Sequence, residues 1–184
     1  MQDIEFTIQE KKLWMLQTRR GKRTGIAAIK IATDMVKERL ITKEVAVGRV
    51  RPHQIYESLL KNIDPKDVEN SLPISLGLPA GPGASCGVAV FTAEKAEELG
   101  KKNKKVILVR EETSPEDIHG MHYSEGILTS RGGLTSHAAL VARGWGKSCV
   151  VGCQDLTIDK SHTFAKIGGK KIKEGDHITL NGSS

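Results

Sequence analysis

Aromatic residues are scarce in this 184-residue chain and make up only 4% of it. A surface that stacks nucleic-acid bases needs aromatic side chains, so we expect no nucleic-acid partner despite a formal net charge of +6. The densest run of lysines, at 101–105, is interpreted as a solvated turn, with attraction of an anionic nucleotide as the alternative.

Long apolar runs are also missing. No stretch approaches the roughly 20 consecutive apolar residues that a membrane-spanning helix requires. The first five residues, Met1 to Glu5, have neither the basic region nor the apolar run of a signal peptide. We therefore expect no membrane partner and a soluble, cytoplasmic protein.

Cysteines number only three, Cys86, Cys149 and Cys153. An odd number without a Cys-x-x-Cys pair argues against a disulfide framework and against a zinc site, so we expect three small, buried apolar side chains. The one close histidine pair, His119 and His122, lacks further ligands, so no metal is expected there. A Ser-His-Asp hydrolase is disfavoured because the chain has no Gly-x-Ser-x-Gly elbow.

The most informative segment surrounds His137. A strand-like run at 126–130 leads into Gly132 and Gly133, and the apolar spacing that follows predicts a short helix ending near Gly144. His137 therefore lies in the first turn of a helix. First turns present unpaired backbone N–H groups and the positive end of the helix dipole, and glycines let an anion approach the backbone closely.

An anion site next to a histidine suggests phosphoryl transfer. Imidazole is substantially neutral and nucleophilic near neutral pH, so His137 could accept a phosphoryl group on one ring nitrogen. The alternative is that His137 only caps its helix or packs against it.

Residues 132–144, Gly-Gly-Leu-Thr-Ser-His-Ala-Ala-Leu-Val-Ala-Arg-Gly, resemble the phosphohistidine signature of the phosphoenolpyruvate-utilising enzymes. Within that group the segment is similar to the pyruvate, phosphate dikinases. In phosphoenolpyruvate synthase and sugar-transport enzyme I an arginine stands where this chain has Leu134. The paired Cys149 and Cys153 also favour the dikinases, whereas Leu134 and Trp145 are conservative apolar changes from the methionine that dikinases more often carry.

The resemblance implies a carrier role for His137. In that family the histidine takes the β-phosphoryl group from ATP in one active site, and its domain then swings to a barrel domain where pyruvate receives the group. Arg131 or Arg143 would be a charge partner, with bonding of Arg143 to a sheet or a helix end as the alternative. Thr135 matches a threonine that a regulatory kinase modifies in some dikinases, and a helix cap is its plainer role. The phosphate cradle would consist of Gly132, Gly133, Thr135 and Ser136, including the backbone at 134–136.

The first 20 residues predict a hairpin, with strands at 3–8 and 13–17. From the residues alone, an amphipathic hairpin with a charged face is the favoured interpretation. The segment is similar, however, to the last two strands of the dikinase ATP-grasp domain. That similarity implies Mg²⁺ and ATP in the full-length enzyme, with no tightly bound cofactor in this chain. The residues assigned to nucleotide and metal are Asp3, Glu5, Gln17 and Arg19.

Helical spacing at 24–40, a capped helix from Thr42 to about Val50 and a short helix at 54–60 indicate a helical linker. Residues 62–78 contain Pro65, Pro73 and a polar run, which place a domain boundary near Asn70. Residues 78–87 are expected to be turn and loop before a strand at 88–91.

Later strands and helices first alternate and then give way to hairpins, which predicts a mixed α/β fold. This agrees with the β/β/α swivelling phosphohistidine domain that the resemblance implies. The predicted parts are an ATP-grasp hairpin at 1–22, a helical linker at 23–69 and the phosphohistidine domain at 70–184.

Two hypotheses about the whole protein stay open. In one, the chain is a fragment of a dikinase whose partners are its own ATP-grasp and pyruvate-binding barrel domains, in an enzyme that forms a homodimer. The isolated chain would then not complete a catalytic cycle. In the other, it is a stand-alone phosphocarrier or regulatory module related to phosphoenolpyruvate synthase or sugar-transport enzyme I.

Overall fold

The computed structural model describes residues 2–21 and 23–183, in two compact units that comprise residues 1–59 and 60–184. Residues Met1, Lys22 and Ser184, which the predicted domain ranges include, lie outside the described residues. The boundary that the sequence predicted near Asn70 falls inside the second unit. The division into three parts stays a prediction.

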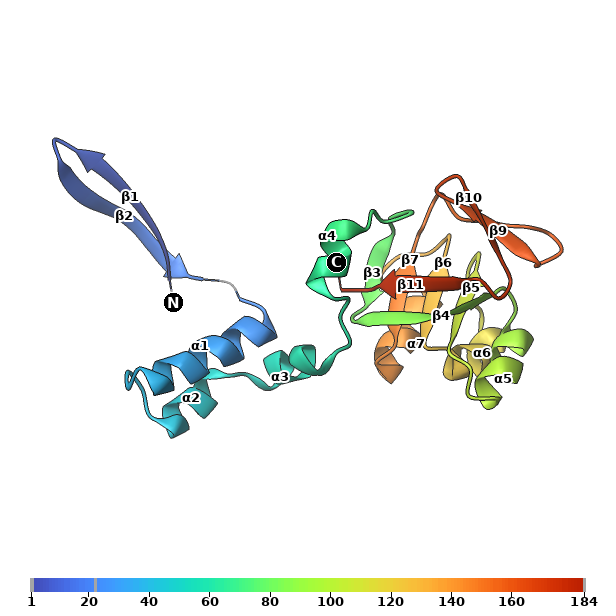
Figure 1. The fold of residues 1–184 in the computed structure, drawn as a ribbon, viewed down its shortest axis with the longest axis horizontal. Coiled ribbons are helices and arrows are strands. Elements are labelled where there is room, and N and C mark those ends of the chain that lie inside the picture. The colour runs from blue at the N-terminus through green and yellow to red at the C-terminus, as the bar shows by residue number, and fades with distance from the viewer. Residues whose placement is uncertain (1, 22, 184) are drawn as a thin grey trace. The chain divides into compact units, whose positions relative to one another are not determined.

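The first unit begins with the predicted hairpin, formed by antiparallel strands β1 (Gln2–Gln9) and β2 (Lys12–Arg20) (Figure 1). Glu10 and Lys11 have φ values of 51° and 60°, as a two-residue turn with left-handed backbone requires. Every residue from 2 to 20 is exposed. The hairpin therefore contributes no buried core of its own.

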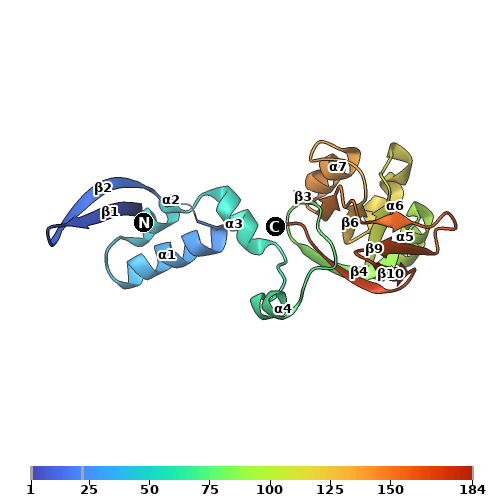
Figure 2. The same ribbon diagram turned by 90° about the horizontal axis from the view of Figure 1, so that it is seen from above.

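Three helices complete this unit, namely α1 (Gly25–Lys37), α2 (Lys43–Arg49) and α3 (Pro52–Leu59), as the sequence predicted (Figure 2). The hydroxyls of Thr24 and Thr42 cap α1 and α2, each accepting a backbone N–H at 3.4 Å. Proline fits the first helical turn, so α3 begins at Pro52 rather than after it.

The second unit starts with α4 (Pro65–Asn70), in the stretch where the sequence placed the domain boundary. The Asp64 carboxylate accepts the N–H of Lys66 at 2.9 Å, and Pro65 occupies the first turn. A cap followed by proline therefore begins a short helix in this polar stretch.

A six-stranded sheet, in the order β11-β4-β5-β6-β7-β3, forms the centre of the second unit. Strands β4 to β7 are parallel, and β3 and β11 pair antiparallel at the two edges. The strands are β3 (Leu78–Gly81), β4 (Ala84–Val90), β5 (Val106–Arg110), β6 (Gly126–Thr129), β7 (Ser148–Val151) and β11 (His177–Asn181).

The turn and loop predicted for 78–87 was wrong, because β3 and most of β4 occupy this range. Pro79 is tolerated since β3 is an edge strand. Gly87 is required by close packing, since a Cβ there would lie 2.6 Å from the carbonyl oxygen of Lys105. Glycine and proline therefore mark close strand contacts here rather than loops.

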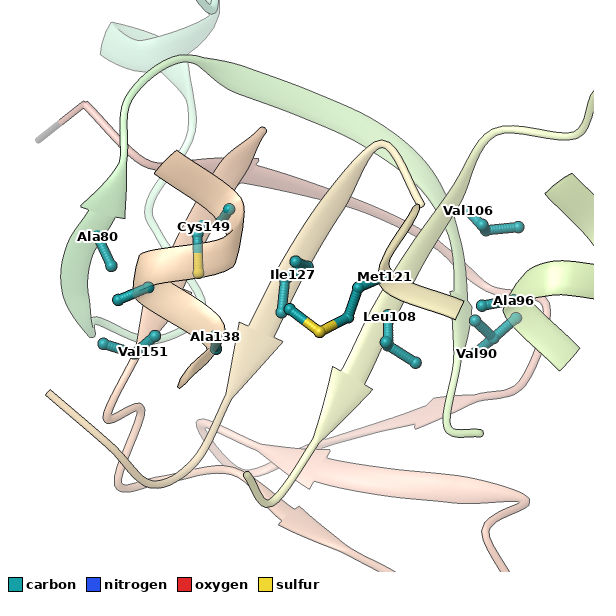
Figure 3. Close-up of a cluster of buried hydrophobic side chains, with 12 residues drawn as sticks. Ala80, Val90, Ala96, Val106, Leu108, Met121, Ile127, Ala138, Cys149 and Val151 are labelled. Atoms are coloured by element: carbon teal, nitrogen blue, oxygen red, sulfur yellow. The ribbon is translucent and has the colours of Figure 1, made fainter. Parts of the chain in front are cut away.

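Two layers cover the sheet. Helices α5 (Ala93–Lys101), α6 (Ile118–Tyr123) and α7 (His137–Trp145) lie on one face, with a 3-10 turn, η1 (Pro115–Asp117), before α6. Strands β8 (Thr157–Ile158), β9 (Phe164–Ile167) and β10 (Lys170–Lys173) form a second sheet on the other face. Figure 3 shows the helix-side core, where Met121 and Leu108 lie beside Ile127. The predicted α/β fold with β/β/α layers is confirmed.

Cys149 and Cys153 are buried, as predicted, but Cys86 is exposed, so the prediction was wrong for that residue. Its neighbours Ser85 and Gly87 take the inward positions of the alternating strand β4. Within the part of the chain that the structure describes, no helix has the length and apolar character needed to cross a membrane.

Candidate functional site

His137 is the first residue of α7, which follows the carboxyl end of β6. Ser136 is the N-cap, and its hydroxyl accepts the N–H of Ala139 at 3.4 Å. The N–H of Ser136 itself donates to the carbonyl of Gly133 at 2.9 Å. The predicted position of His137 in a helix first turn is confirmed, and the cap is Ser136 rather than Thr135.

The two glycines before this helix, Gly132 and Gly133, differ in backbone conformation and in the space around them. Gly132 has a φ of 101°, and a Cβ there would lie 2.9 Å from the Cβ of Ser136. A Cβ on Gly133 would meet no atom of the described chain within 4 Å. Gly132 therefore serves the turn, whereas the space beside Gly133 is open to a ligand. Thr135 is exposed and has no hydrogen bond to the rest of the described chain.

Thr113 is the neighbour of His137 that the sequence analysis did not identify. Its Oγ1 lies 3.1 Å from Nδ1 of His137, across 24 residues of sequence. Thr113 follows β5, and the turn with His137 follows the parallel strand β6, so both lie at the carboxyl edge of one sheet. Ligand sites collect at this edge in open parallel sheets, and that rule was the available signal.

Both predicted arginine partners have contacts within the protein. Arg143 donates from Nη2 to the carbonyl of Leu134 at 2.7 Å and from Nη1 to the carbonyl of Ala80 at 3.4 Å. It therefore ties the segment before His137 to strand β3, which matches the alternative of bonding to the sheet. Arg131 lies 3.8 Å from Glu111, and both side chains are exposed.

In the first unit, the hairpin brings its four predicted residues together on one face. Asp3 lies opposite Arg19 and Glu5 opposite Gln17 in the strand register. The Arg19 guanidinium is 3.6 Å from Asp3 and 3.9 Å from Glu5. The described residues contain no group of three or more His, Cys, Asp or Glu side chains arranged to hold a metal. Two carboxylates nevertheless fit Mg²⁺, which is commonly held by one or two carboxylates together with substrate phosphates.

Burial changes the pKa of two groups near α7, the Cys149 thiol and the Lys147 ammonium. It raises the pKa of the Cys149 thiol to about 12, so this cysteine stays protonated and inert at neutral pH. Burial also lowers the pKa of Lys147, whose Nζ donates to the carbonyls of His122 and Ser124. These contacts give Lys147 a structural role at the end of α6.

Comparison with known proteins agrees with this geometry. Residues 102–184 match the family described as "PEP-utilising enzyme, mobile domain". The chain is 53% identical over 184 residues to pyruvate, phosphate dikinase 2 of Zea mays, and 53% identical over 187 residues to pyruvate, phosphate dikinase of Rhizobium meliloti (strain 1021). It is also 53% identical over 185 residues to the chloroplastic dikinase 1 of Arabidopsis thaliana.

Each of these alignments covers 100% of the chain but only 21%, 20% and 19% of the respective relative. The chain thus spans about one fifth of the length of these proteins. The resemblance inferred from residues 132–144 is confirmed.

Proposed function

We infer, from the homology of the whole chain to pyruvate, phosphate dikinase, that His137 carries a phosphoryl group between two active sites of such an enzyme. One site would hold ATP and phosphate, and the other pyruvate and phosphoenolpyruvate. The observation that carries this proposal is the contact of Thr113 with Nδ1 of His137, beside the open space at Gly133.

Thr113 selects the reacting nitrogen. If Nδ1 carries the proton and donates it to the Thr113 hydroxyl, the other ring nitrogen, Nε2, keeps a lone pair. Among the described residues Nε2 has no hydrogen-bond partner. Nε2 is then the nucleophile, and Thr113 orients the ring.

Each transfer step exchanges one bond for another. The Nε2 lone pair forms a bond to the β-phosphorus of ATP while the bond from that phosphorus to the AMP oxygen breaks, and its electron pair stays on that oxygen. Inorganic phosphate then attacks the γ-phosphorus and leaves as pyrophosphate, so that one phosphoryl group remains on Nε2. In the last step, the enolate oxygen of pyruvate attacks phosphorus and the electron pair of the N–P bond returns to Nε2. Backbone N–H groups at the start of α7 stabilise the phosphoryl oxygens in these steps.

The partners we propose are an ATP-grasp domain and a pyruvate-binding barrel domain of the same protein. Leu134 and Leu140, which are 48% and 56% exposed on either side of His137, provide apolar contacts for both. The hairpin face with Asp3 and Glu5 would hold Mg²⁺, which neutralises nucleotide phosphates when bound. We further propose a cytoplasmic enzyme that forms a homodimer.

Regulation through Thr135 is a second part of the proposal. Its side chain is exposed two residues before His137 and is not used as the helix cap, so a kinase can reach it. A phosphate there would add about two negative charges beside the nucleophile and repel a second anion.

Label transfer tests the carrier role. We expect the complete protein, incubated with phosphoenolpyruvate labelled in its phosphoryl group, to acquire one acid-labile, base-stable label. His137→Asn should abolish the label, whereas His122→Asn, a change at another histidine exposed in the same unit, should leave it intact. Label that persists in His137→Asn, or that maps to His119 or His122, would show that His137 is not the acceptor.

A further inference from the structure

Thr113 is held in place by a buried carboxylate four residues along the chain. The Asp117 side chain is 7% exposed, and its Oδ2 accepts the N–H of Ser114 at 2.9 Å and the Ser114 hydroxyl at 3.3 Å. These bonds close the turn that begins η1, directly after Thr113. The backbone position of Thr113 therefore depends on Asp117.

The same carboxylate forms an ion pair with the sheet. Oδ1 of Asp117 lies 3.3 Å from Nη2 of Arg110, whose side chain is 27% exposed. Arg110 is the last residue of β5, and its Nη1 donates to the carbonyl of Phe91 at 3.3 Å, just past the end of β4. Arg110 thus connects the ends of two neighbouring strands to the turn.

The position of this ion pair is more informative than its contribution to stability. A buried carboxylate needs a partner, but a buried ion pair is weak evidence for stabilisation, since desolvation offsets the attraction. Nε of Arg110 is buried and has no hydrogen-bond partner among the residues that the structure describes, which adds to the cost of keeping this residue here. An arrangement that is costly for stability and directed at the turn next to His137 indicates a role in positioning.

We propose that the Arg110–Asp117 pair is a positioning device that holds the Thr113 hydroxyl on Nδ1 of His137 and so keeps Nε2 deprotonated for attack. This inference rests on the proposed carrier role of His137. Neither residue touches the reacting atoms, and both act through Thr113. The chain of contacts runs from the strand ends through Arg110, Asp117 and the Ser114 turn to Thr113.

A double-mutant cycle on phosphotransfer measures this coupling. In the complete protein, Asp117→Asn should lower the single-turnover rate of His137 phosphorylation on the order of tenfold, because small displacements of a reacting group are costly. Thr113→Val should have a similar effect. If the pair acts through Thr113, adding Asp117→Asn to Thr113→Val should change the rate by less than about twofold.

Tautomer populations provide a readout that a purely structural role would leave unchanged. In the 184-residue chain with ¹⁵N-labelled histidine, the ring shifts of His137 should indicate a protonated Nδ1. Both Asp117→Asn and Thr113→Val should move the ring toward a mixture of tautomers. Glu111→Gln, which changes an exposed carboxylate in the same loop, is the matched control. It should change neither the tautomer of His137 nor the rate of its phosphorylation.

Arg110 variants keep the test decisive if Asp117→Asn does not fold. Arg110→Lys retains a cation opposite Asp117 and should preserve most of the rate, whereas Arg110→Met should lose about as much as Thr113→Val. Additive effects in the cycle, or unchanged His137 shifts in the folded variants, would overturn the positioning role while leaving the carrier role intact. Absence of label on His137 in the unmodified protein would instead count against the carrier role itself.

Discussion

At the residue scale, the sequence was enough to find His137 but not its partner. Two glycines, a hydroxyl cap and an apolar stripe are local signals, and they placed His137 at the start of a helix, where it is observed. Thr113 reaches it across 24 residues because β5 and β6 are adjacent parallel strands, and that pairing is a property of the fold. The arginine roles were open for the same reason, since the carbonyl partners of Arg143 come from two separate segments.

A residue-scale prediction separates the two glycines. Gly133→Val should leave the melting temperature nearly unchanged, because its Cβ meets nothing within 4 Å. The valine side chain would fill the space through which a phosphoryl group reaches the backbone N–H groups. It should therefore slow single-turnover phosphorylation of His137 on the order of a hundredfold, as when a transferring anion is deprived of one donor.

Gly132→Ala is the control for this experiment. With a φ of 101° and a Cβ 2.9 Å from that of Ser136, alanine at 132 should lower the melting temperature. Near-normal transfer by Gly133→Val would mean that the glycine serves only the turn and that the phosphate lies elsewhere.

At the element scale, the segments with strong local signals were predicted well. Helices α1 and α2 lie where the apolar spacing and the threonine cap placed them. Strands β3 and β8 and the first half of β4 were missed, because their glycines, prolines and short lengths resemble loops until neighbouring strands pair with them. These segments therefore become strands through pairing with strands distant in sequence, which local propensity does not reveal.

Two identical substitutions in helices test the packing of the elements. Gly120→Ala in α6 should lower the free energy of unfolding by about 1–3 kcal/mol, because the new Cβ would lie 2.5 Å from Cα of Ala93 at the start of α5. In Gly144→Ala, in α7, the new Cβ has no atom of the described chain within 4 Å. This variant should therefore raise the free energy of unfolding by about 0.5–1 kcal/mol. Chemical denaturation of both variants measures the difference, and two changes of the same sign would contradict the packing described for α5 and α6.

At the scale of the whole molecule, the hairpin is the part that this chain cannot stabilise alone. A two-stranded hairpin is marginal in water, and one face of this one exposes apolar side chains. They are Ile4, Phe6, Ile8, Leu13 and Met15, between 50% and 66% exposed. The proposed ATP-grasp domain would cover them. The second unit, by contrast, has a core on both faces of its sheet.

The identity of the phosphorylated nitrogen tests the central claim most directly. The complete protein would be labelled from phosphoenolpyruvate and hydrolysed in alkali, and the two phosphohistidine isomers would be separated by chromatography, with His137→Asn as the control. Because Thr113 occupies Nδ1, we predict that all label is recovered as the Nε2 isomer and that none remains in the control. Label recovered as the Nδ1 isomer, or label that survives the loss of His137, would contradict the account.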